Sequence, residues 1–196
     1  DNEIEREYWD KRQLVKKINL NSLYGAILNP GCRFFDIRIG QSVTLTGRCI
    51  TKHMASKVNE IVAGKYDHKG ESIVYGDTDS VYFTAHKTLK KEINDGTIPW
   101  TKDSVVALYD KISDEVNTSF KAFMTRAFHT PSTRGEVIAA GRELVASKGL
   151  FITKKRYAVL YYDKEGERTD TEGKEGKMKA MGLDLKRSDT PVFVQD

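Results

Sequence analysis

The feature that most constrains the fold is a pair of short apolar segments that flank a run of turn residues. Residues 72–75 and 80–83 are rich in β-branched and aromatic side chains, and Gly-Asp-Thr-Asp lies between them at residues 76–79. This pattern predicts a β-hairpin over residues 72–84, with residues 76–79 as its turn. The hairpin therefore places two carboxylates at the tip of an otherwise apolar segment.

The two carboxylates, Asp77 and Asp79, are two residues apart. Side chains two apart in an extended chain point to the same side, so these two face a common point and repel unless a cation neutralises them. Mg²⁺ prefers carboxylate oxygens and commonly takes one or two of them together with substrate phosphates. The spacing thus favours a divalent-metal site suited to phosphoryl transfer. An ordinary hairpin turn is the alternative, because Gly, Asp and Thr are common turn residues.

Helical and extended patterns alternate along the rest of the chain. Helical spacing predicts helices over residues 3–28, 41–63 and 103–128, the last with a buried stripe of Val105, Leu108, Ile112, Val116, Phe123 and Ala127. Extended patterns predict strands over residues 33–38, 136–140, 150–162 and 178–181. This order indicates an α+β fold in which helices pack on an antiparallel sheet.

A second group of polar residues shares one face of the first predicted helix. Lys17, Asn21, Tyr24 and Gly25 are spaced i, i+4, i+7 and i+8. A lysine can reach phosphate oxygens, an aromatic ring can pack on a base, and a glycine lets a flat group approach the helix. The stripe therefore indicates a nucleotide-binding surface. A solvated helix face with one aromatic anchor is the alternative.

A basic run, Lys154, Lys155, Arg156 and Tyr157, falls in a predicted strand. Alternation places Lys154 and Arg156 on one face and Lys155 and Tyr157 on the other. Cations on a sheet beside an active site suit contacts to nucleic-acid phosphates or minor-groove edges. A bare run of this kind is more often a solvated edge strand.

Composition narrows the class of protein further. The net charge of +4 fits both a nucleic-acid partner and an ordinary enzyme. Cys32 and Cys49 have no Cys-x-x-Cys spacing, so no zinc site is expected. No segment reaches the ~18 apolar residues of a membrane span, and we expect a cytoplasmic protein, in the host cell if the source is a phage.

Three motifs in this order resemble those of the family B (alpha-like) DNA polymerases. They are Tyr-Gly-Asp-Thr-Asp-Ser at 75–80, Lys-x-x-x-Asn-Ser-x-Tyr-Gly at 17–25 and Lys-Lys-Arg-Tyr at 154–157. The last of these resembles the form found in replicative polymerases of tailed phages. The resemblance implies a partial fingers helix over residues 1–30 and a palm domain with a palm-type sheet over residues 31–196.

The resemblance also implies roles for individual residues. Asp79, and less constantly Asp77, would hold the catalytic metal ions, and Lys17 would contact the incoming triphosphate. Tyr24 and Gly25, with Asn21 in the same motif, would lie against the nascent base pair. The residues that would grip the primer are Lys154, Lys155, Arg156 and Tyr157. Glu136 is a further metal-site candidate, with a structural salt bridge as the alternative, and Lys179 and Arg187 are further DNA-backbone candidates.

The implied activity is transfer of a nucleotide from a dNTP to a primer 3′-OH on template DNA, with two Mg²⁺ or Mn²⁺ ions. An upstream Asp-x-x-Ser-Leu-Tyr-Pro segment, the exonuclease acids and the thumb are not in this sequence. We therefore expect no nucleotide incorporation by the chain alone, and expect the missing portions in the same or a separate chain. A DNA-binding module without chemistry is the alternative, and another palm-fold enzyme, such as a nucleotide cyclase or reverse transcriptase, is a more distant one.

Overall fold

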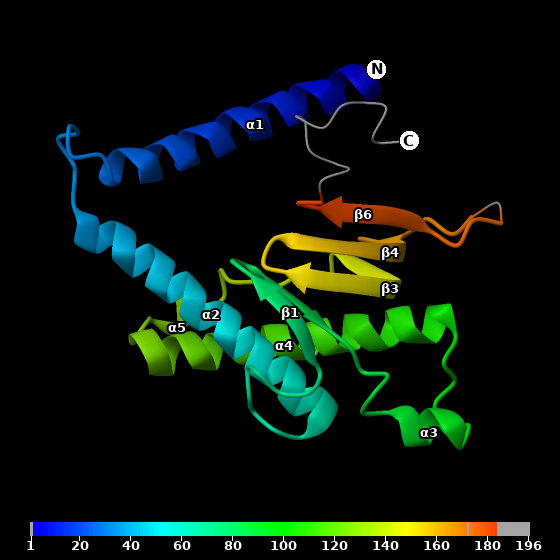
Figure 1. Cartoon of the computed structure of the whole chain (residues 1–196). Helices are drawn as coiled ribbons and strands as arrows, with labels where there is room; N and C mark the ends of the chain where they lie inside the picture. Colours follow the sequence, from blue (N-terminus) through cyan, green and yellow to red (C-terminus); the bar gives the residue numbers. More distant parts are fainter. Residues whose placement is uncertain (1, 172, 184–196) are drawn as a thin grey trace. The chain divides into compact units, whose positions relative to one another are not determined.

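The computed structural model describes residues 2–171 and 173–183 and confirms the α+β class (Figure 1). It divides into two compact units, Asp1–Ile50 and Thr51–Asp196, with the boundary inside the second helix. In chain order the described elements are α1 (Asn2–Ile27), α2 (Ile37–Ala63), β1 (Ile73–Asp77), β2 (Ser80–Phe83), α3 (Lys90–Asn94), α4 (Lys102–Phe128), α5 (Ser132–Gly135), β3 (Leu144–Thr153), β4 (Arg156–Lys164), β5 (Glu167–Arg168) and β6 (Lys177–Met181). None of the helices in the described part is long and apolar enough to cross a membrane.

The first unit consists of α1, its connection to α2 and the first half of α2. The helix predicted over residues 3–28 is confirmed as α1, and none of its described side chains is buried. At its end the chain turns back, and Leu28 packs directly against Gly40 of α2. A Cβ on Gly40 would lie 2.0 Å from a Leu28 methyl carbon, so only glycine fits this contact without a shift.

The strand predicted over residues 33–38 is wrong, because Asp36 caps α2 there instead. The Asp36 carboxylate accepts a hydrogen bond from the backbone N–H of Arg38 at 2.9 Å, and its carbonyl accepts from Ile39 at 3.1 Å. The guanidinium of Arg38 also bonds this carboxylate, which lowers the pKa of Asp36 to about 2. A capping aspartate thus starts the helix within an alternating aromatic segment.

The second unit is built on α4, whose buried face supports both sheets. The helix predicted over residues 103–128 is confirmed, but its buried residues are Val105, Ile112, Val116, Phe120 and Met124. Leu108 and Phe123 are only half-buried, and Ala127 is exposed. The real stripe follows steps of seven and four residues, which track one side of a helix over its full length better than the predicted set.

The β-structure forms two antiparallel sheets in this unit. One is the β1–β2 hairpin, and the other has β4 in its centre, with β3 on one side and β5 and β6 on the other. The hairpin near residues 72–84 and the strand near 178–181 are confirmed as β1–β2 and β6. Within the described residues β3 pairs only with β4, so its other edge carries no strand.

The strand predicted over residues 136–140 is wrong, because helix side chains bind this segment. Asn117 accepts from the Ala140 N–H at 2.7 Å and donates to the Ala140 carbonyl at 2.9 Å, and Ser113 donates to the same carbonyl at 3.1 Å. The backbone groups of Ala140 are therefore satisfied by α4 rather than by a neighbouring strand. The strand β3 begins only at Leu144.

A buried histidine joins α2 to α4. The side chain of His53 is 6% exposed, and its Nε2 lies 2.9 Å from the Ser119 hydroxyl, which itself donates to a carbonyl of α4. Ser119 must therefore accept from Nε2, so Nδ1 accepts from the Tyr66 hydroxyl at 2.8 Å. Burial lowers the pKa of His53, and the charges of Lys57 and Arg126 lower it further.

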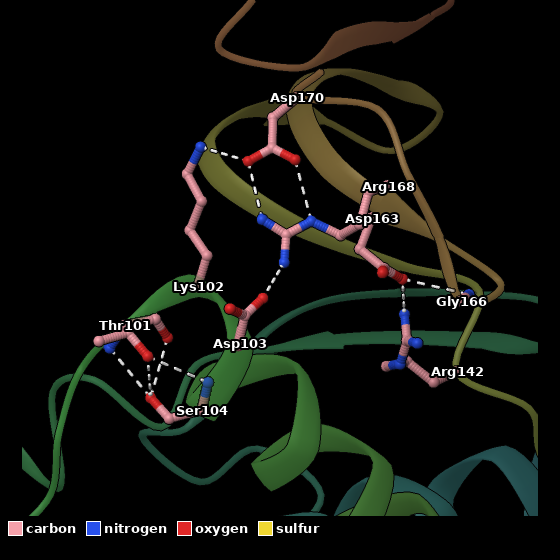
Figure 2. A network of polar contacts seen from close by, with 9 residues as sticks. All are labelled: Thr101, Lys102, Asp103, Ser104, Arg142, Asp163, Gly166, Arg168 and Asp170. Carbon is pink, nitrogen blue, oxygen red and sulfur yellow. Dashed lines mark hydrogen bonds and ion pairs between the residues drawn. The ribbon is translucent and has the colours of Figure 1, made fainter. Parts of the chain in front are cut away.

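Charged side chains fasten the end of the second sheet to the start of α4 (Figure 2). Asp170 receives two hydrogen bonds from Arg168, at 2.8 and 2.9 Å, and one from Lys102 at 2.6 Å. Arg168 also bonds Asp103 in the first turn of α4. Together these contacts hold the β5 region and the helix N-terminus as one piece.

A second ion pair in this region is almost completely buried. Asp163 is 2% exposed and accepts from the guanidinium of Arg142 at 2.5 Å and from the Gly166 N–H at 3.2 Å (Figure 2). Arg142 also bonds Asp110 of α4. A buried carboxylate with two donors is satisfied, whereas the same carboxylate alone would be costly to bury.

Candidate active site

The acid-bearing hairpin is tighter than the sequence predicts. Asp77 pairs with Ser80, so the turn consists of Thr78 and Asp79 rather than all four residues from Gly76 to Asp79. Thr78 has a positive φ of 48°, as a tight turn of this kind requires. Asp77 is therefore the last residue of β1, and the alternation of a strand does not fix the direction of Asp79.

The two carboxylates differ in their surroundings. Asp77 is half-buried and accepts a hydrogen bond from the Thr78 hydroxyl at 3.1 Å. Asp79 is exposed, and its carboxylate has no hydrogen-bond or ion-pair partner among residues 2–171 and 173–183. Thr51 of α2 donates to the Thr78 carbonyl at 2.9 Å and so fixes the turn from outside the hairpin. The tip thus presents one carboxylate that is free to bind a ligand.

Asp79 lies at the rim of a cavity between β2 and β3. The cavity has a volume of about 630 Å³ and is lined by Ser80 to Thr84 on one side and by Glu143 to Gly149 on the other. Apolar residues of α2 and α4 also line it, among them Val58, Ile112 and Val116. Two strand edges therefore face a common space within the second unit.

The basic run is split between a turn and a strand, so the single alternating strand predicted for it is wrong: Arg156 and Tyr157 begin β4, whereas Lys154 and Lys155 precede it. Thr153 pairs with Arg156, which leaves Lys154 and Lys155 as a two-residue turn between β3 and β4. Lys155 has a positive φ of 61°. Lys154, Lys155 and Arg156 are exposed, whereas Tyr157 is 6% exposed and belongs to the core.

The structure brings the acid hairpin and the basic turn together. The Tyr75 hydroxyl accepts a hydrogen bond from the backbone N–H of Lys155 at 2.7 Å, and the hydroxyls of Tyr82 and Tyr157 are 3.1 Å apart. Burial and the contact with Tyr157 raise the pKa of Tyr82, so its hydroxyl stays protonated. The β1–β2 hairpin lies beside the β3–β4 turn in Figure 1.

The helix motif lies on α1, which belongs to the first unit, whereas the two acids belong to the second unit. Lys17 and Asn21 are exposed, and a Cβ at Gly25 would meet nothing within 4 Å. Tyr24 is half-buried, and its hydroxyl donates to the Gly40 carbonyl at 3.4 Å. The motif residues thus share an accessible stretch of helix, with the tyrosine anchored at one side.

The remaining site candidates lie in other surroundings. Glu136 follows α5, and its exposed carboxylate bonds the ammonium of Lys121. Lys179 of β6 pairs with Glu143 at 2.6 Å. Arg187 lies outside the described residues. No cluster of three or more metal-ligating His, Cys, Asp or Glu side chains occurs in the part of the chain that the structure describes.

The donor set of the hairpin suits magnesium. The Asp79 carboxylate has no partner among the described residues, the Asp77 carboxylate accepts from Thr78 through one oxygen, and both groups are hard oxygen ligands. One or two protein carboxylates, with substrate phosphates and water, are the usual ligands of Mg²⁺. The site residues that sequence reasoning missed are Thr51 and Tyr75, which position the acid hairpin through contacts 27 and 80 residues apart.

The family model for DNA polymerase family B matches residues 1–196, and the chain belongs to that family.

Its sequence is 32% identical over 194 residues to the DNA-directed DNA polymerase of Escherichia phage RB69, covering 93% of this chain and 21% of that protein. It is 32% identical over 197 residues to the DNA-directed DNA polymerase of Enterobacteria phage T4, covering 94% and 21%. A DNA polymerase delta catalytic subunit from Oryza sativa subsp. japonica is 29% identical, covering 98% and 15%. The chain thus spans about a fifth of the length of the phage relatives.

Proposed function

We propose that this chain carries the metal-binding hairpin, the nucleotide-binding helix and a primer-binding turn of a DNA-directed DNA polymerase. The observation that supports this most directly is the unpaired Asp79 carboxylate at the tip of a hairpin whose Tyr75 is bonded to the Lys155 turn. An acid that binds metal and cations that bind DNA phosphates need to be neighbours in an enzyme that extends a primer.

The acid hairpin binds the metal ions, and the helix α1 binds the incoming nucleotide. Asp79 and Asp77 hold Mg²⁺ or Mn²⁺, which when bound balances the charge that develops on the transferred phosphoryl group. On α1, Lys17 contacts the triphosphate of the incoming dNTP as a point charge. Tyr24, oriented by its hydrogen bond to Gly40, and the open surface at Gly25 lie against the new base pair.

The primer is held by the turn between β3 and β4. Lys154, Lys155 and Arg156 are exposed there and contact primer phosphates or minor-groove edges. Tyr157 acts from the core by holding Tyr82 of the acid hairpin. Glu136 stays a candidate for an outer metal contact, and its pairing with Lys121 competes with that role.

The cavity between β2 and β3 is where we place a further strand, supplied by a segment that is not in this sequence. Among the described residues neither of the edges that line the cavity pairs with a further strand, and apolar residues of α2 and α4 line the cavity as well. A strand seated there would pair with both sheets and join them. If that strand brings the upstream acid of the Asp-x-x-Ser-Leu-Tyr-Pro segment, the metal ligand set is complete only when it is present.

The test compares this chain alone with a chimera in which it replaces the matching segment of the phage RB69 polymerase. Primer extension with dNTP and Mg²⁺ is expected from the chimera and not from the chain alone. Asp79→Asn should abolish extension by the chimera, and Asp114→Asn, a matched change at an exposed acid of α4, should leave it intact. Extension that survives Asp79→Asn would refute the proposal.

A DNA-binding module without chemistry predicts a different result. Manganese binding to the 196-residue chain, followed by electron paramagnetic resonance, should weaken in Asp79→Asn and not in Asp114→Asn. If the two variants bind manganese equally while both bind primed DNA, the chain is such a module.

A further inference from the structure

Four aromatic rings join the acid hairpin to the hairpin that carries the basic turn. Tyr75 lies 5.3 Å from Phe151 and 5.5 Å from Tyr157, measured between ring centroids. Tyr82 lies 5.3 Å and 5.4 Å from the same two rings. Ring packing of this kind stabilises the contact between the two hairpins but does not by itself fix the position of the turn between β3 and β4.

One hydrogen bond reaches the turn itself. The Tyr75 hydroxyl accepts from the backbone N–H of Lys155 at 2.7 Å, within the length of a strong, directional bond. Lys155 has a left-handed backbone in a two-residue turn, so its amide points out of the β3–β4 ladder. The second hydroxyl contact, between Tyr82 and Tyr157, joins strand residues and does not reach the turn.

Tyr75 is also tied to the acids. It lies two residues before Asp77 on β1, so the two side chains leave the same face of the strand. The Tyr75 side chain therefore connects β1, which ends at Asp77, to the backbone of Lys155.

We propose that Tyr75 is a positioning residue that sets the register between bound metal and primer. Its hydroxyl holds the Lys154–Lys155 turn at a fixed offset from Asp77 and Asp79, and that offset decides which primer nucleotide lies at the metal. The inference rests on the proposed function and adds a residue to it. Functional groups need to be held within about 0.5 Å, which one directional bond supplies and ring packing alone does not.

Localised cleavage of DNA by a bound metal tests this on the 196-residue chain without any polymerase activity. Fe²⁺ is added in place of Mg²⁺, with ascorbate and hydrogen peroxide, to the chain bound to an end-labelled primer–template. Hydroxyl radicals cut the primer near the iron, so the pattern of cuts reports the register. Wild-type protein should give cuts centred on few nucleotides, and Asp79→Asn should remove that focus.

Tyr75→Phe keeps the ring and removes only the hydroxyl. We expect the share of cuts at the strongest nucleotide to fall about twofold or more, while affinity for DNA stays within about twofold. Tyr66→Phe is the matched control, because it also removes a tyrosine hydroxyl with a 2.8 Å contact, made to His53 and not to the β3–β4 turn. Its cutting pattern should equal that of the wild type.

Hydrogen exchange of the Lys155 amide confirms that the bond is lost, since that amide should exchange faster in Tyr75→Phe only. If exchange is faster but the cuts stay as focused as in Tyr66→Phe, Tyr75 does not set the register. If the wild type itself shows no Asp79-dependent focus, the proposed function fails instead.

Discussion

Among the aspartates that bond an arginine, Asp163 and Asp103 differ strongly in burial, and that difference should make Asp163 contribute far more to stability than Asp103. Asp163 is 2% exposed and pairs with Arg142, whereas the side chain of Asp103 is 89% exposed and pairs with Arg168. Changing each to asparagine keeps the size and removes the charge. Because both changes are aspartate to asparagine in an aspartate–arginine pair, a difference in the free energy of unfolding between the two variants reports the effect of burial.

The magnitudes follow from the partners that remain. Asp163→Asn leaves the largely buried Arg142 with only Asp110, and breaking a buried pair costs 3 to 5 kcal/mol; we expect the lower end, about 3 kcal/mol, because Asp110 still offsets the charge. Asp103→Asn leaves Arg168 with two hydrogen bonds to Asp170. An exposed pair of that kind contributes about 0.5 kcal/mol or less.

Urea unfolding followed by tryptophan emission measures both changes. Trp100 packs against the core cluster of Val105, Val145 and Tyr162, so its emission reports the second unit. The exposed Trp9 adds a nearly constant background. Equal shifts of the two midpoints, or a loss below about 1 kcal/mol for Asp163→Asn, would show that burial does not decide the strength of these pairs.

Three further changes have expected outcomes. The pKa of His53 is lowered in the folded protein, so the imidazole of the unfolded chain takes up a proton at a higher pH than that of the folded chain. The stability that neutral His53 contributes is therefore present above about pH 6.5 and is lost as pH falls through the folded pKa. Urea midpoints measured from pH 7.5 to 5 should fall less in His53→Gln than in the wild type. Removing both lysines, Lys154→Ala and Lys155→Ala, should lower the slope of log DNA affinity against log salt by about 2, measured by anisotropy. Asn117→Ala should cost about 1 to 3 kcal/mol, since it leaves the Ala140 N–H without its acceptor, and Asn117→Asp should restore that part in a thermal melt.

The long helices were predictable because their signals are local. Helical spacing over residues 3–28, 41–63 and 103–128 located α1, α2 and α4, and Gly64 ends α2 with a positive φ of 73°. Local rules failed where a distant or single side chain took over. Asp36 converted an alternating aromatic segment into a helix start, and Asn117 bound a segment that reads as extended.

The candidate site was predictable to a similar extent. The carboxylates at Asp77 and Asp79 were found because turn residues between apolar arms are a strong hairpin signal. The turn at Lys154 and Lys155 gave no such signal, since it contains neither glycine nor asparagine. The contacts of Thr51 and Tyr75 join residues far apart in the sequence, and no single-sequence pattern encodes them.

At Lys155, the backbone conformation favours glycine, whereas the proposed DNA contact requires a positively charged side chain. At a left-handed φ of 61°, a residue with a Cβ has a conformational free energy about 1 kcal/mol higher than glycine. Glycine at position 155 would therefore give a more stable turn. A glycine would keep the N–H that Tyr75 binds but would delete a positive charge. The protein thus accepts a less stable loop in order to keep an ammonium group at that point.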